Sequence, residues 1–417
     1  MSEITTYEKT KDSGIEWIGS VPSHWRVHTL YQLVTQVKEK NSNLQEKNLL
    51  SLSYGKIKRK DIDSPDGLLP ASFDGYNIIE DGDIVLRLTD LQNDHTSLRV
   101  GLATERGIIT SAYTTLRPID TSNSKYLYYL LHAFDLKKGF YGMGSGVRQG
   151  LNYAEVKELR VVLPSQDEQN AIVRFLDNQC GQIDSIIEEA KSSIEEYKKW
   201  RASIIFEAVT KGLNPLAEMK DSHIDWIGLV PSHWKLSRIK NELDNLDYLR
   251  EPISAEKREN ILGLYDYYGA SGVIDKIDDY NVDDKVLLIG EDGANLRMRN
   301  LPLVYKAEGK FWVNNHAHIL KVHDDNCYGF IAYLLEAGDY SVFITGSAQP
   351  KLSQFNLMRF PIVIPPLVEQ QEIEAYLDEK CSAIDALIRE KKSLLSELEI
   401  YKRSLILETV TGKRKVV

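Results

Sequence analysis

The sequence predicts an α/β (α+β) fold in which two mixed α/β lobes alternate with two long helices that pack as an antiparallel coiled coil. Three observations lead to this prediction. Large blocks of the sequence occur twice, two long stretches carry the apolar spacing of a coiled coil, and the other segments consist of short apolar runs between turn residues. The two halves are therefore expected to be related by a pseudo-twofold axis.

The duplication is visible in two separate blocks. The motif Trp-Ile-Gly-x-Val-Pro-Ser-His-Trp occupies residues 17–25 and returns at residues 226–234, 209 positions later. A second block, residues 163–184, returns at residues 364–385 with an offset of 201. Solenoid repeats are about 20–50 residues long, so this much longer period indicates a duplicated domain.

Residues 167–211 are predicted to form the first long helix. Apolar side chains recur there at alternating steps of three and four residues, which is the spacing of a coiled-coil seam. No Pro or Gly interrupts the stretch from Gln182 to Lys211, and Gly212 supplies a stop signal. The seam residues are Leu176, Cys180, Ile183, Ile187, Ala190, Ile194 and Tyr197.

Residues 369–411 repeat this pattern as the second long helix, and Gly412 ends it at the matching position. At about 1.5 Å per residue, each helix should span roughly 60–65 Å. The seam is interrupted by Lys391 and otherwise consists of Leu377, Cys381, Ile384, Ile388, Leu395 and Leu398.

A long helix with one narrow apolar seam needs a partner helix. Homodimerisation through each seam is one solution, but the segment between the two helices is long enough to return the chain, so we expect them to pair in antiparallel order. This arrangement separates Cys180 from Cys381 by roughly 28 Å, whereas a disulfide needs Cα atoms within about 7 Å. All three cysteines, Cys327 included, are therefore expected to be reduced and buried.

Residues 20–163 and 229–364 approximately delimit the two mixed α/β lobes, for which we expect mostly antiparallel sheet. Short apolar runs that begin or end at Asp, Gly or Pro indicate strands, and each lobe holds one short helical stretch. The predicted strands are residues 81–86, 160–164 and 281–290, and the predicted helices are residues 125–133 and 328–337.

The composition of the 417 residues is that of a soluble globular protein, with 42% hydrophobic and 27% charged residues. The sequence has no apolar run of about 18 residues and opens with no signal peptide, so we expect no membrane contact and a cytoplasmic location. The net charge of −10 argues against a polyanion partner unless local patches or another subunit supply positive charge. The tail Lys413–Lys415 is interpreted as the one plainly basic segment.

Sequence motifs of catalysis are absent. The chain has no P-loop, no GxGxxG after a strand, no GxSxG, no HExxH and no Asn/Asp-Pro-Pro-aromatic signature of an amino-methyltransferase. The cysteines lack the spacing of a metal site, so no cofactor, metal or catalytic residue is expected. His24 and His233 lie beside Trp in the duplicated motif and are interpreted as turn-packing residues rather than bases.

Glycine-flanked polar loops are the candidate binding sites. Asn and Arg read adenine and guanine edges through paired hydrogen bonds, and Gly lets the backbone approach phosphate. The candidates in the second lobe are Asn295, Arg297, Arg299, Asn314, Asn315, His316, Ser347, Gln349 and Lys351. The candidates in comparable places of the first lobe are Arg87, Thr89, Ser145, Arg148 and Gln149.

Two other interpretations of the loops in the second lobe are open at this point. One is a packed turn with capping Asn residues. The other is a metal site formed by Glu291, Asp292, His316 and His318.

The sequence resembles the DNA-specificity subunits of type I restriction–modification enzymes over nearly its whole length. The resemblance rests on the Trp-Ile-Gly-x-Val-Pro-x-His-Trp start of each lobe and the Pro-x-x-x-Glu-Gln-x-x-Ile start of each long helix. It also rests on the helix ends Val209-Thr210 and Val410-Thr411-Gly412. The loops between Gly290 and His316 look like one class of that family's target recognition domains.

The resemblance implies two target recognition domains, residues 1–164 and 214–366, each of which reads one half of a split double-stranded DNA site. It implies two conserved long helices, in residues 165–213 and in residues 367–417 with the basic tail, that hold the domains apart. These helices would dock two methyltransferase (modification) subunits, and ATP-dependent restriction subunits would join for cleavage. The chain itself is then not an enzyme, because methylation and base flipping belong to the partner.

The two half-sites are expected to differ, because the segment 290–316 has no clean match in the first lobe. A rival interpretation is a two-lobed coiled-coil adaptor that binds only proteins. A self-contained nuclease is disfavoured, because no cluster of metal-binding carboxylates with a nearby Lys stands out in the sequence.

Overall fold

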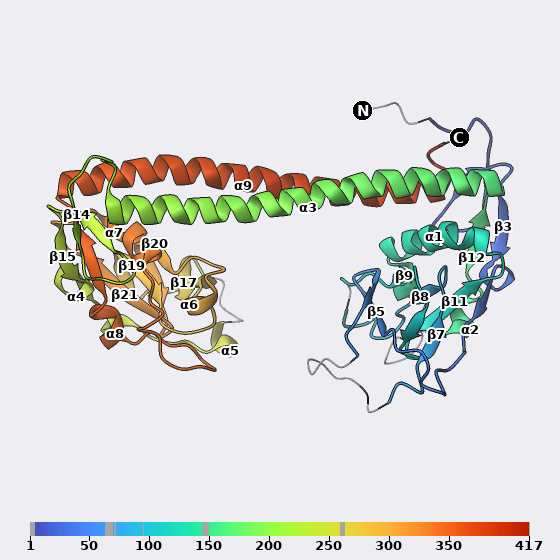
Figure 1. Ribbon diagram of the computed structural model, residues 1–417, viewed down its shortest axis with the longest axis horizontal. Coiled ribbons are helices and arrows are strands. Elements are labelled where there is room, and N and C mark those ends of the chain that lie inside the picture. Colours follow the sequence, from blue (N-terminus) through green and yellow to red (C-terminus); the bar gives the residue numbers. More distant parts are fainter. Residues whose placement is uncertain are drawn as a thin grey trace. The chain divides into compact units, whose positions relative to one another are not determined.

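The structure is a computed structural model, and it describes residues 5–62, 70, 72–94, 96–143, 150–258 and 263–416. The chain divides into two compact units (Figure 1). Unit 1 comprises Met1–Ala190 together with Lys392–Val417, and unit 2 comprises Lys191–Lys391. Helix α3 (Gln166–Lys211) and helix α9 (Leu367–Val410) are continuous across these limits, so each unit contains one lobe and a part of both long helices.

Unit 1 is built from short strands that pair in antiparallel order. Its main sheet has four strands in the order β4-β11-β8-β9, accompanied by the ribbons β1-β2, β3-β12, β5-β6 and β7-β10. The strands are β1 (Thr10–Asp12), β2 (Ser20–Pro22), β3 (Arg26–Thr29), β4 (Val34–Gln36), β5 (Leu50–Ser53), β6 (Lys56–Arg59), β7 (Asn77–Ile79), β8 (Ile84–Leu86), β9 (Val100–Leu102), β10 (Gly107–Ile109), β11 (Thr114–Pro118) and β12 (Arg160–Leu163). The short helices are η1 (Leu30–Gln32), η2 (Thr121–Asn123), α1 (Ser124–Leu136), η3 (Gly139–Gly142) and α2 (Tyr153–Val156).

Helix α1 lies between the sheet of unit 1 and the long helices (Figure 1). Most of its residues are apolar and buried, as expected for a helix that is covered on opposite sides. The core that it shares with the sheet and with α3 contains Leu127, Leu130, Leu131 and Phe134 of α1 together with Leu86, Val100 and Leu176. Unit 1 therefore has three layers: sheet, short helix and long-helix pair.

Unit 2 contains a six-stranded sheet in the order β16-β21-β19-β20-β17-β18, with the ribbons β13-β14 and β15-β22. Neighbouring strands in this sheet are antiparallel except β17 and β20, which are parallel. The strands are β13 (Met219–Asp221), β14 (Leu229–Pro231), β15 (Lys235–Arg238), β16 (Leu243–Asn245), β17 (Tyr265–Gly269), β18 (Gly272–Ile277), β19 (Val282–Gly290), β20 (Val304–Val313), β21 (Ala317–Val322) and β22 (Pro361–Ile364). The short helices are α4 (Ile239–Glu242), η4 (Asp247–Leu249), α5 (Ala255–Arg258), α6 (Asn295–Met298), α7 (Tyr328–Ala337) and α8 (Gln354–Met358).

The two lobes share one topology. The pairing β4-β11-β8-β9 of unit 1 matches β16-β21-β19-β20 of unit 2 in chain order, and helices α1 and α7 follow equivalent strands. The last strand before each long helix pairs in both units with the strand that follows the Trp motif, as β12 with β3 and β22 with β15. The lobes differ in extent, since β19 has 9 residues whereas its counterpart β8 has 3.

In unit 1, the beginning of α3 packs against the end of α9. Leu176 and Ile183 of α3 lie in the same core as Leu405 of α9. An ion pair of 2.6 Å between Asp184 Oδ1 and Lys402 Nζ joins the two helices beside this core.

In unit 2, the end of α3 packs against the beginning of α9. Ile205 of α3 lies in the same core as Ile373 and Leu377 of α9, and Arg201 Nε lies 3.1 Å from Asp385 Oδ1. Within each unit the helices therefore run in opposite directions. The predicted antiparallel pairing is confirmed, and each apolar seam is covered by the same chain rather than by a second copy.

The three cysteines are buried and free, as predicted. Cys180 belongs to the core of unit 1, whereas Cys327 and Cys381 belong to the core of unit 2.

In unit 2, the duplicated Trp motif joins the ends of the two long helices. Trp234 is buried, and its Nε1 donates a 3.1 Å hydrogen bond to Oε1 of Glu369 at the start of α9. His233 Nε2 lies 2.8 Å from the other oxygen of this carboxylate. Gly212 ends α3 with a φ of +73°, and a Cβ there would lie 3.2 Å from the Trp234 ring. The indole therefore lies between the end of α3 and the start of α9.

The same junction is present in unit 1 with the roles of the helices exchanged. Trp25 is fully buried, and His24 Nε2 lies 2.9 Å from Oε2 of Glu168 at the start of α3. Gly412 ends α9 with a φ of +71°, and a side chain there would clash with Pro22 and Trp25. Both motif histidines hold a carboxylate at a helix start, which agrees with their interpretation as packing residues.

The predicted fold class is confirmed. The long helices differ from the predicted ranges by one or two residues at their ends, and each predicted strand and short helix occurs. The observed counterparts of these short elements are β8, β12, β19, α1 and α7.

A buried histidine in α1 makes the stability of unit 1 sensitive to acid. Burial, together with the charge of Lys402 on α9, lowers the pKa of His132 to about 4. In the unfolded chain the histidine ring takes up a proton near its usual pKa of about 6.5. The contribution of His132 to the free energy of unfolding is therefore fully present above that pH and is lost as the pH falls through the folded pKa. The pKa of Asp135, raised by burial to about 6, acts in the opposite direction.

We therefore predict the pH dependence of a His132→Leu variant relative to the unmodified protein. Between about pH 7 and pH 5, the unmodified chain should lose about 2 kcal/mol more unfolding free energy than the variant. Asp135 is present in both proteins, so its contribution cancels in this difference. Urea unfolding of both proteins at the two pH values measures it, and equal losses would contradict the assignment.

Candidate nucleic-acid interface

Three loops of unit 2 meet at the carboxyl end of β19. They are the loop that follows β19, the turn between β20 and β21, and the loop of residues 346–352. The amide of Glu291 donates to the carbonyl of His316 at 2.9 Å, and the amide of Leu352 donates to the carbonyl of Glu291 at 2.7 Å. The structure thus brings together candidate residues that lie in three separate segments of the sequence.

A buried histidine–carboxylate pair lies beneath these loops. The side chain of His318 is fully buried, with Nδ1 at 2.6 Å from Asp247 Oδ2 and Nε2 at 2.8 Å from the carbonyl oxygen of Leu352. Both ring nitrogens therefore have a polar partner within the lobe. The remaining carboxylate oxygen of Asp247 accepts a 2.9 Å hydrogen bond from the amide of Ile319.

Further charges extend this pair towards the surface. Arg250 contacts Asp247 at 3.4 Å and also pairs with Glu291. The other oxygen of Glu291 lies 2.9 Å from Lys351 Nζ. Basic and acidic side chains therefore alternate from His318 to Lys351 and connect the β21 strand, the η4 turn and two of the loops.

The network keeps both carboxylates ionised. Burial acts to raise the pKa of Asp247, but hydrogen bonds from His318 and Ile319 and the charge of Arg250 outweigh it and leave the pKa below its usual value. Burial likewise acts to raise the pKa of Glu291, and its bonds to Lys351 and Arg250 lower it overall. A buried charge is stable only when it is paired in this way.

Five of the candidates in unit 2 present exposed side chains above the network. Arg297 on α6 donates from Nη2 to the carbonyl of Gly346 at 3.0 Å, which joins α6 to the third loop. His316 Nδ1 lies 2.8 Å from Asp292 Oδ2. These five are Arg297, Asn315, His316, Ser347 and Gln349, and the side chains of Arg299 and Lys351 are exposed as well.

Four other candidates hold the loops in place. The side chain of Asn295 accepts from the amide of Leu301 at 2.9 Å, and buried Asn314 accepts from the amide of His316 at 2.8 Å. Arg299 donates to the carbonyls of Glu336 in the last turn of α7 and of Gly338 directly after it, at 2.5 and 3.2 Å. The fourth is Lys351, which pairs with Glu291. The interpretation as capping residues therefore describes Asn295 and Asn314.

The metal-site interpretation has no support in the described part of the chain, where no group of three or more His, Cys, Asp or Glu is arranged to hold a metal ion. The carboxylate of Glu291 instead pairs with the side chains of Arg250 and Lys351. Each histidine of the segment pairs with a separate carboxylate, His316 with Asp292 and His318 with Asp247.

In unit 1, Arg87 and Thr89 follow β8, at the place where the Glu291 loop follows β19. Arg87 Nη2 lies 3.7 Å from Asp94 Oδ2, and the side chain of Thr89 is exposed. Buried Arg99 organises this loop, since its Nη1 donates to the carbonyl of Thr89 at 2.8 Å. Its backbone amide donates to Asp135 at 2.6 Å. The other candidates, Ser145, Arg148 and Gln149, lie outside the described residues.

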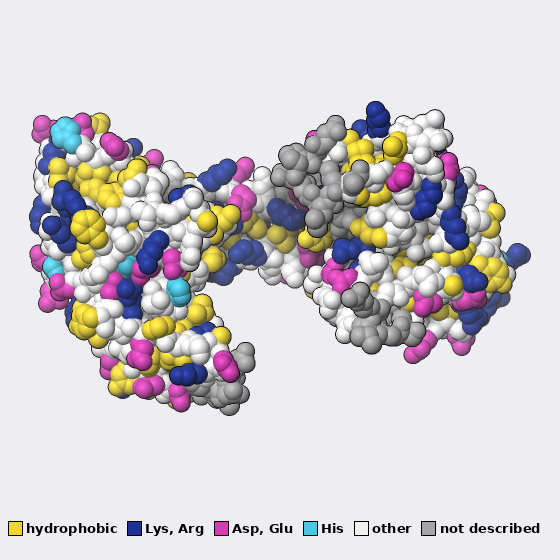
Figure 2. Space-filling model, turned by 90° about the horizontal axis from the view of Figure 1, so that it is seen from below, with side chains coloured by type: hydrophobic (Ala, Val, Ile, Leu, Met, Phe, Trp, Pro, Cys, Tyr) yellow, Lys and Arg dark blue, Asp and Glu magenta, His cyan; other side chains and the backbone are white. Residues whose placement is uncertain are grey.

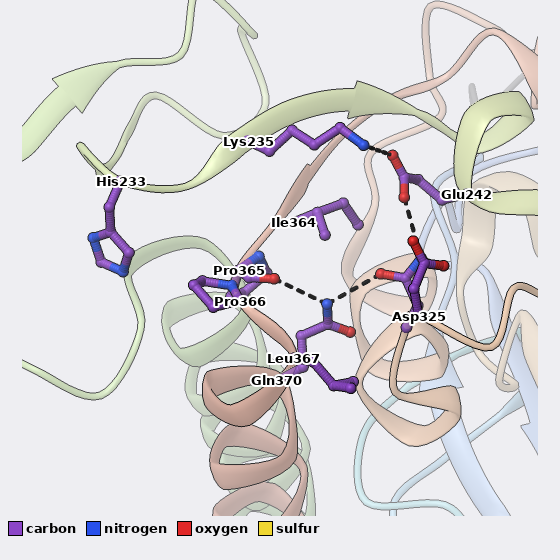
Figure 3. A pocket seen from close by; sticks show the side chains of 10 residues that line it. His233, Lys235, Glu242, Asp325, Ile364, Pro365, Pro366, Leu367 and Gln370 are labelled. Carbon is purple, nitrogen blue, oxygen red and sulfur yellow. Dashed lines mark hydrogen bonds and ion pairs between the residues drawn. The ribbon is translucent and has the colours of Figure 1, made fainter.

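A cavity of about 310 Å³ lies in unit 2 where the Trp motif meets the start of α9 (Figure 3). Its polar groups are already paired. The carboxylate of buried Glu242 accepts hydrogen bonds from Lys235 Nζ at 2.7 Å and from the side-chain amide of Asn326 at 3.1 Å. Gln370 donates to the carbonyl of Pro365 at 2.9 Å and to Asn326 at 3.0 Å. These contacts join lobe and helix and leave no unpaired charge among the groups named.

Comparison with known proteins decides the family. The model of the type I restriction modification DNA specificity domain matches residues 73–196 and 231–397, which is more than half of the chain. The chain belongs to this family. The first match covers the part of the first lobe from residue 73 on, the second covers nearly all of the second lobe, and each continues through most of the following long helix.

Two curated relatives carry names of type I restriction enzyme specificity subunits. A Haemophilus influenzae protein is 33% identical over 146 residues, which is 35% of this chain and 36% of the relative. A Methanocaldococcus jannaschii protein, named for the MjaX system, is 30% identical over 119 residues, 28% of this chain and 26% of the relative. The matched segments thus span about a third or less of either relative's length.

The fold has a counterpart among solved structures. A chain from a structure concerned with complex assembly and conformational transition of the type I R-M system superposes with a TM-score of 0.68 at 14% identity. The match covers 94% of this chain and 98% of the other. The architecture of this specificity chain is thus that of a known fold, and it is the non-catalytic component of its family's complexes. No described helix is long and apolar enough to cross a membrane.

The surface charge of the specificity chain is mixed. On the face shown in Figure 2, Lys and Arg side chains lie among Asp and Glu side chains. The expectation that the C-terminal tail is the one plainly basic segment was wrong, because Lys56, Lys58, Arg59 and Lys60 form a second and longer basic run. The tail is partly neutralised, since Arg414 pairs with Glu408 at 3.0 Å.

We predict that Asp247→Asn destabilises unit 2 of the specificity chain by about 3–5 kcal/mol, because it leaves His318 and Arg250 buried without their shared carboxylate. Asp244→Asn is the matched control. Asp244 pairs with His323 at 3.2 Å on the surface, and loss of an exposed pair should cost about 0–1 kcal/mol. Denaturant unfolding of the two variants compares them, and similar losses would show that the buried network does not stabilise the lobe.

Proposed function

We propose that this chain reads a bipartite, asymmetric double-stranded DNA site, one half with each lobe. The observation that carries the proposal is that one topology occurs twice, with different loops at equivalent places. The lobes agree in strand order, yet β8 leads into a loop organised by Arg99 and β19 into one organised by Glu291. A constant frame with unlike loops suits recognition of two unlike sequences.

The chemistry of the exposed loop of unit 2 supports direct base readout. Arg297, Asn315 and Gln349 are exposed, and such side chains form paired hydrogen bonds with guanine or adenine edges in the major groove. The buried network beneath them fixes the loop before DNA arrives, so that less ordering is required on binding. Most of the phosphate neutralisation would come from other subunits, since the chain has a net charge of −10.

The long helices are proposed to dock two methyltransferase (modification) subunits, with ATP-dependent restriction subunits joining for cleavage. Besides the buried seam, each helix exposes apolar residues at matching positions of the duplication. Trp200 is 52% and Tyr401 is 46% exposed, and Ile186 and Leu387 are exposed by 43% and 38%. Exposed apolar groups at heptad spacing favour a helical partner. A cytoplasmic location follows if the chain acts on chromosomal DNA.

The alternative is a coiled-coil adaptor that binds only proteins, which the exposed apolar groups on the helices would also suit. Duplex DNA pull-down by the full chain co-expressed with the neighbouring methyltransferase gene separates the two. DNA capture supports the proposal, and a stable protein complex without DNA capture supports the adaptor. Methylome sequencing of the host then gives the bipartite site directly.

We predict that Arg297→Ala or Asn315→Ala weakens or relaxes recognition of one half-site only. A lost paired contact with a base should cost about 1–3 kcal/mol at the position that it reads. Arg299→Ala is the control, because Arg299 binds two carbonyls at the end of α7 and its loss should lower stability without changing sequence preference. Methylome sequencing of hosts carrying each variant measures half-site preference. Equal loss at both half-sites would contradict the prediction.

The long helices are further predicted to act as a ruler between the half-sites. Deleting one heptad from each, residues 184–190 and 385–391, preserves the seam because seven residues restore the same face. It removes about 10 Å of helix, equivalent to at most roughly 3 base pairs of unread spacer. Removing four residues from one helix should instead break the pairing. An active double-deletion enzyme with an unchanged spacer in its methylome would exclude the ruler.

A further inference from the structure

The β5–β6 hairpin of unit 1 carries the longer basic run and was not among the candidate binding residues. The strands pair in antiparallel register from Leu50↔Arg59 to Ser53↔Lys56, so the turn between them has two residues, Tyr54 and Gly55. Because side chains alternate between the faces of a strand, this register determines which residues lie on the same side of the hairpin.

One face of the hairpin is apolar and belongs to the core of the lobe. Leu50 and Leu52 are buried in a cluster that includes Ile79, Val85 and Ala103, and Ile57 packs against it. The register pairs Leu52 directly with Ile57. This face therefore fixes the hairpin to the main sheet and leaves the opposite face free for contacts outside the lobe.

The opposite face carries lysines and serines. Ser51 lies across from Lys58 and Ser53 across from Lys56, and Lys60 continues the same alternation beyond the strand. All three lysine side chains are exposed. Lys56 lines a shallow cavity of about 350 Å³ beside Lys125 and Asp177, yet it forms no ion pair with a described residue. Ammonium and hydroxyl groups are the donors that proteins use to contact phosphate oxygens.

Arg59 belongs to the same run but has a different role. Its Nε lies 2.9 Å and its Nη2 2.5 Å from Glu105 Oε2, and Asn48 donates to the same carboxylate at 3.0 Å. This two-point pair ties the base of the hairpin to the segment before β10. The basic run thus contains one cation paired within the lobe, Arg59, and three lysines that form no ion pair with a described residue.

The turn provides an independent observation. Tyr54 is 78% exposed and has a φ of 48°, followed by Gly55 with a φ of 74°. Two-residue turns with both central φ angles positive normally use Asn-Gly or Asp-Gly, and a bulky residue in the first position is strained. A strained, exposed aromatic at a hairpin tip gains nothing from the core, which suggests that it is kept for a contact with another molecule.

We propose that the β5–β6 hairpin is a DNA contact of the first lobe, in which Lys56, Lys58 and Lys60 bind the phosphate backbone and Tyr54 contacts the duplex at the tip. The inference rests on the proposed function and adds an element to it. Two-stranded ribbons fit the grooves of duplex DNA. Duplex DNA is favoured over a membrane surface because the strand face formed by the three lysines and two serines is polar and Tyr54 is the one large ring beside it. It is favoured over an acidic peptide because Ser51 and Ser53 complete a phosphate-binding face.

The test compares two triple variants of the full chain, each co-purified with its modification subunits. Lys56→Gln, Lys58→Gln and Lys60→Gln remove the hairpin charges. The control variant makes the same charge change at exposed positions elsewhere in unit 1, with Lys9→Gln, Lys11→Gln and Lys137→Gln. The probe is a fluorescent duplex oligonucleotide of random sequence, titrated between about 50 and 200 mM salt. The measured quantity is the slope of log K against log salt concentration.

We expect the triple variant of the hairpin to reduce the magnitude of this negative slope by about 0.9 for each lysine that contacts a phosphate. The control triple variant should leave the slope unchanged. Identical slopes for the two triples would overturn the hairpin proposal while leaving the proposed function intact. Failure of the unmodified complex to bind any duplex would instead contradict the proposed function. Circular dichroism of both triples checks that the fold is retained.

Tyr54→Asn separates a contact with DNA from a structural role of the tip. Asn-Gly is the preferred sequence for this turn, so the variant should keep or raise the melting temperature of the protein. We expect duplex affinity to fall about fivefold, the effect of one lost hydrogen bond. Unchanged affinity would remove Tyr54 from the proposed contact.

Discussion

The whole structure depends on one contact, which occurs once in each unit: a buried tryptophan between the end of one long helix and the beginning of the other. Trp234 donates to Glu369 and packs against Gly212. Trp25 lies against Gly412, and its neighbour His24 pairs with Glu168. Each junction therefore needs both helices at once. The C-terminal part of α9 must return to unit 1, which explains why that unit combines the two ends of the chain.

This closure makes the two units equivalent although the chain is linear. Each contains the end of one long helix, a Trp motif, a lobe and the start of the other long helix. The apolar seam supplies most of the attraction between the helices, whereas the junctions and the ion pairs Asp184–Lys402 and Arg201–Asp385 select antiparallel order. The same fold at 14% identity in a solved relative indicates that few positions are needed to maintain this frame.

The lobes show how a constant frame can carry different binding loops. In unit 2, the alternating basic and acidic side chains from His318 to Lys351 hold three loops together, so exposed residues such as Arg297 rest on a rigid base. Unit 1 uses another solution, in which buried Arg99 organises the loop after β8 and the apolar face of the β5–β6 hairpin positions its lysines. The two lobes therefore carry different loops, held in place by different residues, as expected if they read two different half-sites.

The sequence by itself determined the architecture, because its signals are periodic and occur twice. Heptad spacing marked both long helices, the glycines marked their ends, and repeated Trp and Glu-Gln motifs marked the lobes. Periodicity reports which side of an element is buried and needs no knowledge of distant contacts. The basic run at Lys56–Lys60 was equally visible, but its meaning depended on a strand register that assigned Arg59 to Glu105 and the lysines to solvent.

Only the tertiary structure decided which polar residues support the loops and which are exposed. Asn295 and Asn314 have the same side chain as Asn315, yet the first two bind backbone groups within unit 2, whereas Asn315 is exposed. The partner of His318 is Asp247, 71 positions away in sequence, and no local pattern predicts such a pairing. A side chain's hydrogen-bonding capacity is set by its type, but the partner that uses it is set by the packing of segments distant in sequence.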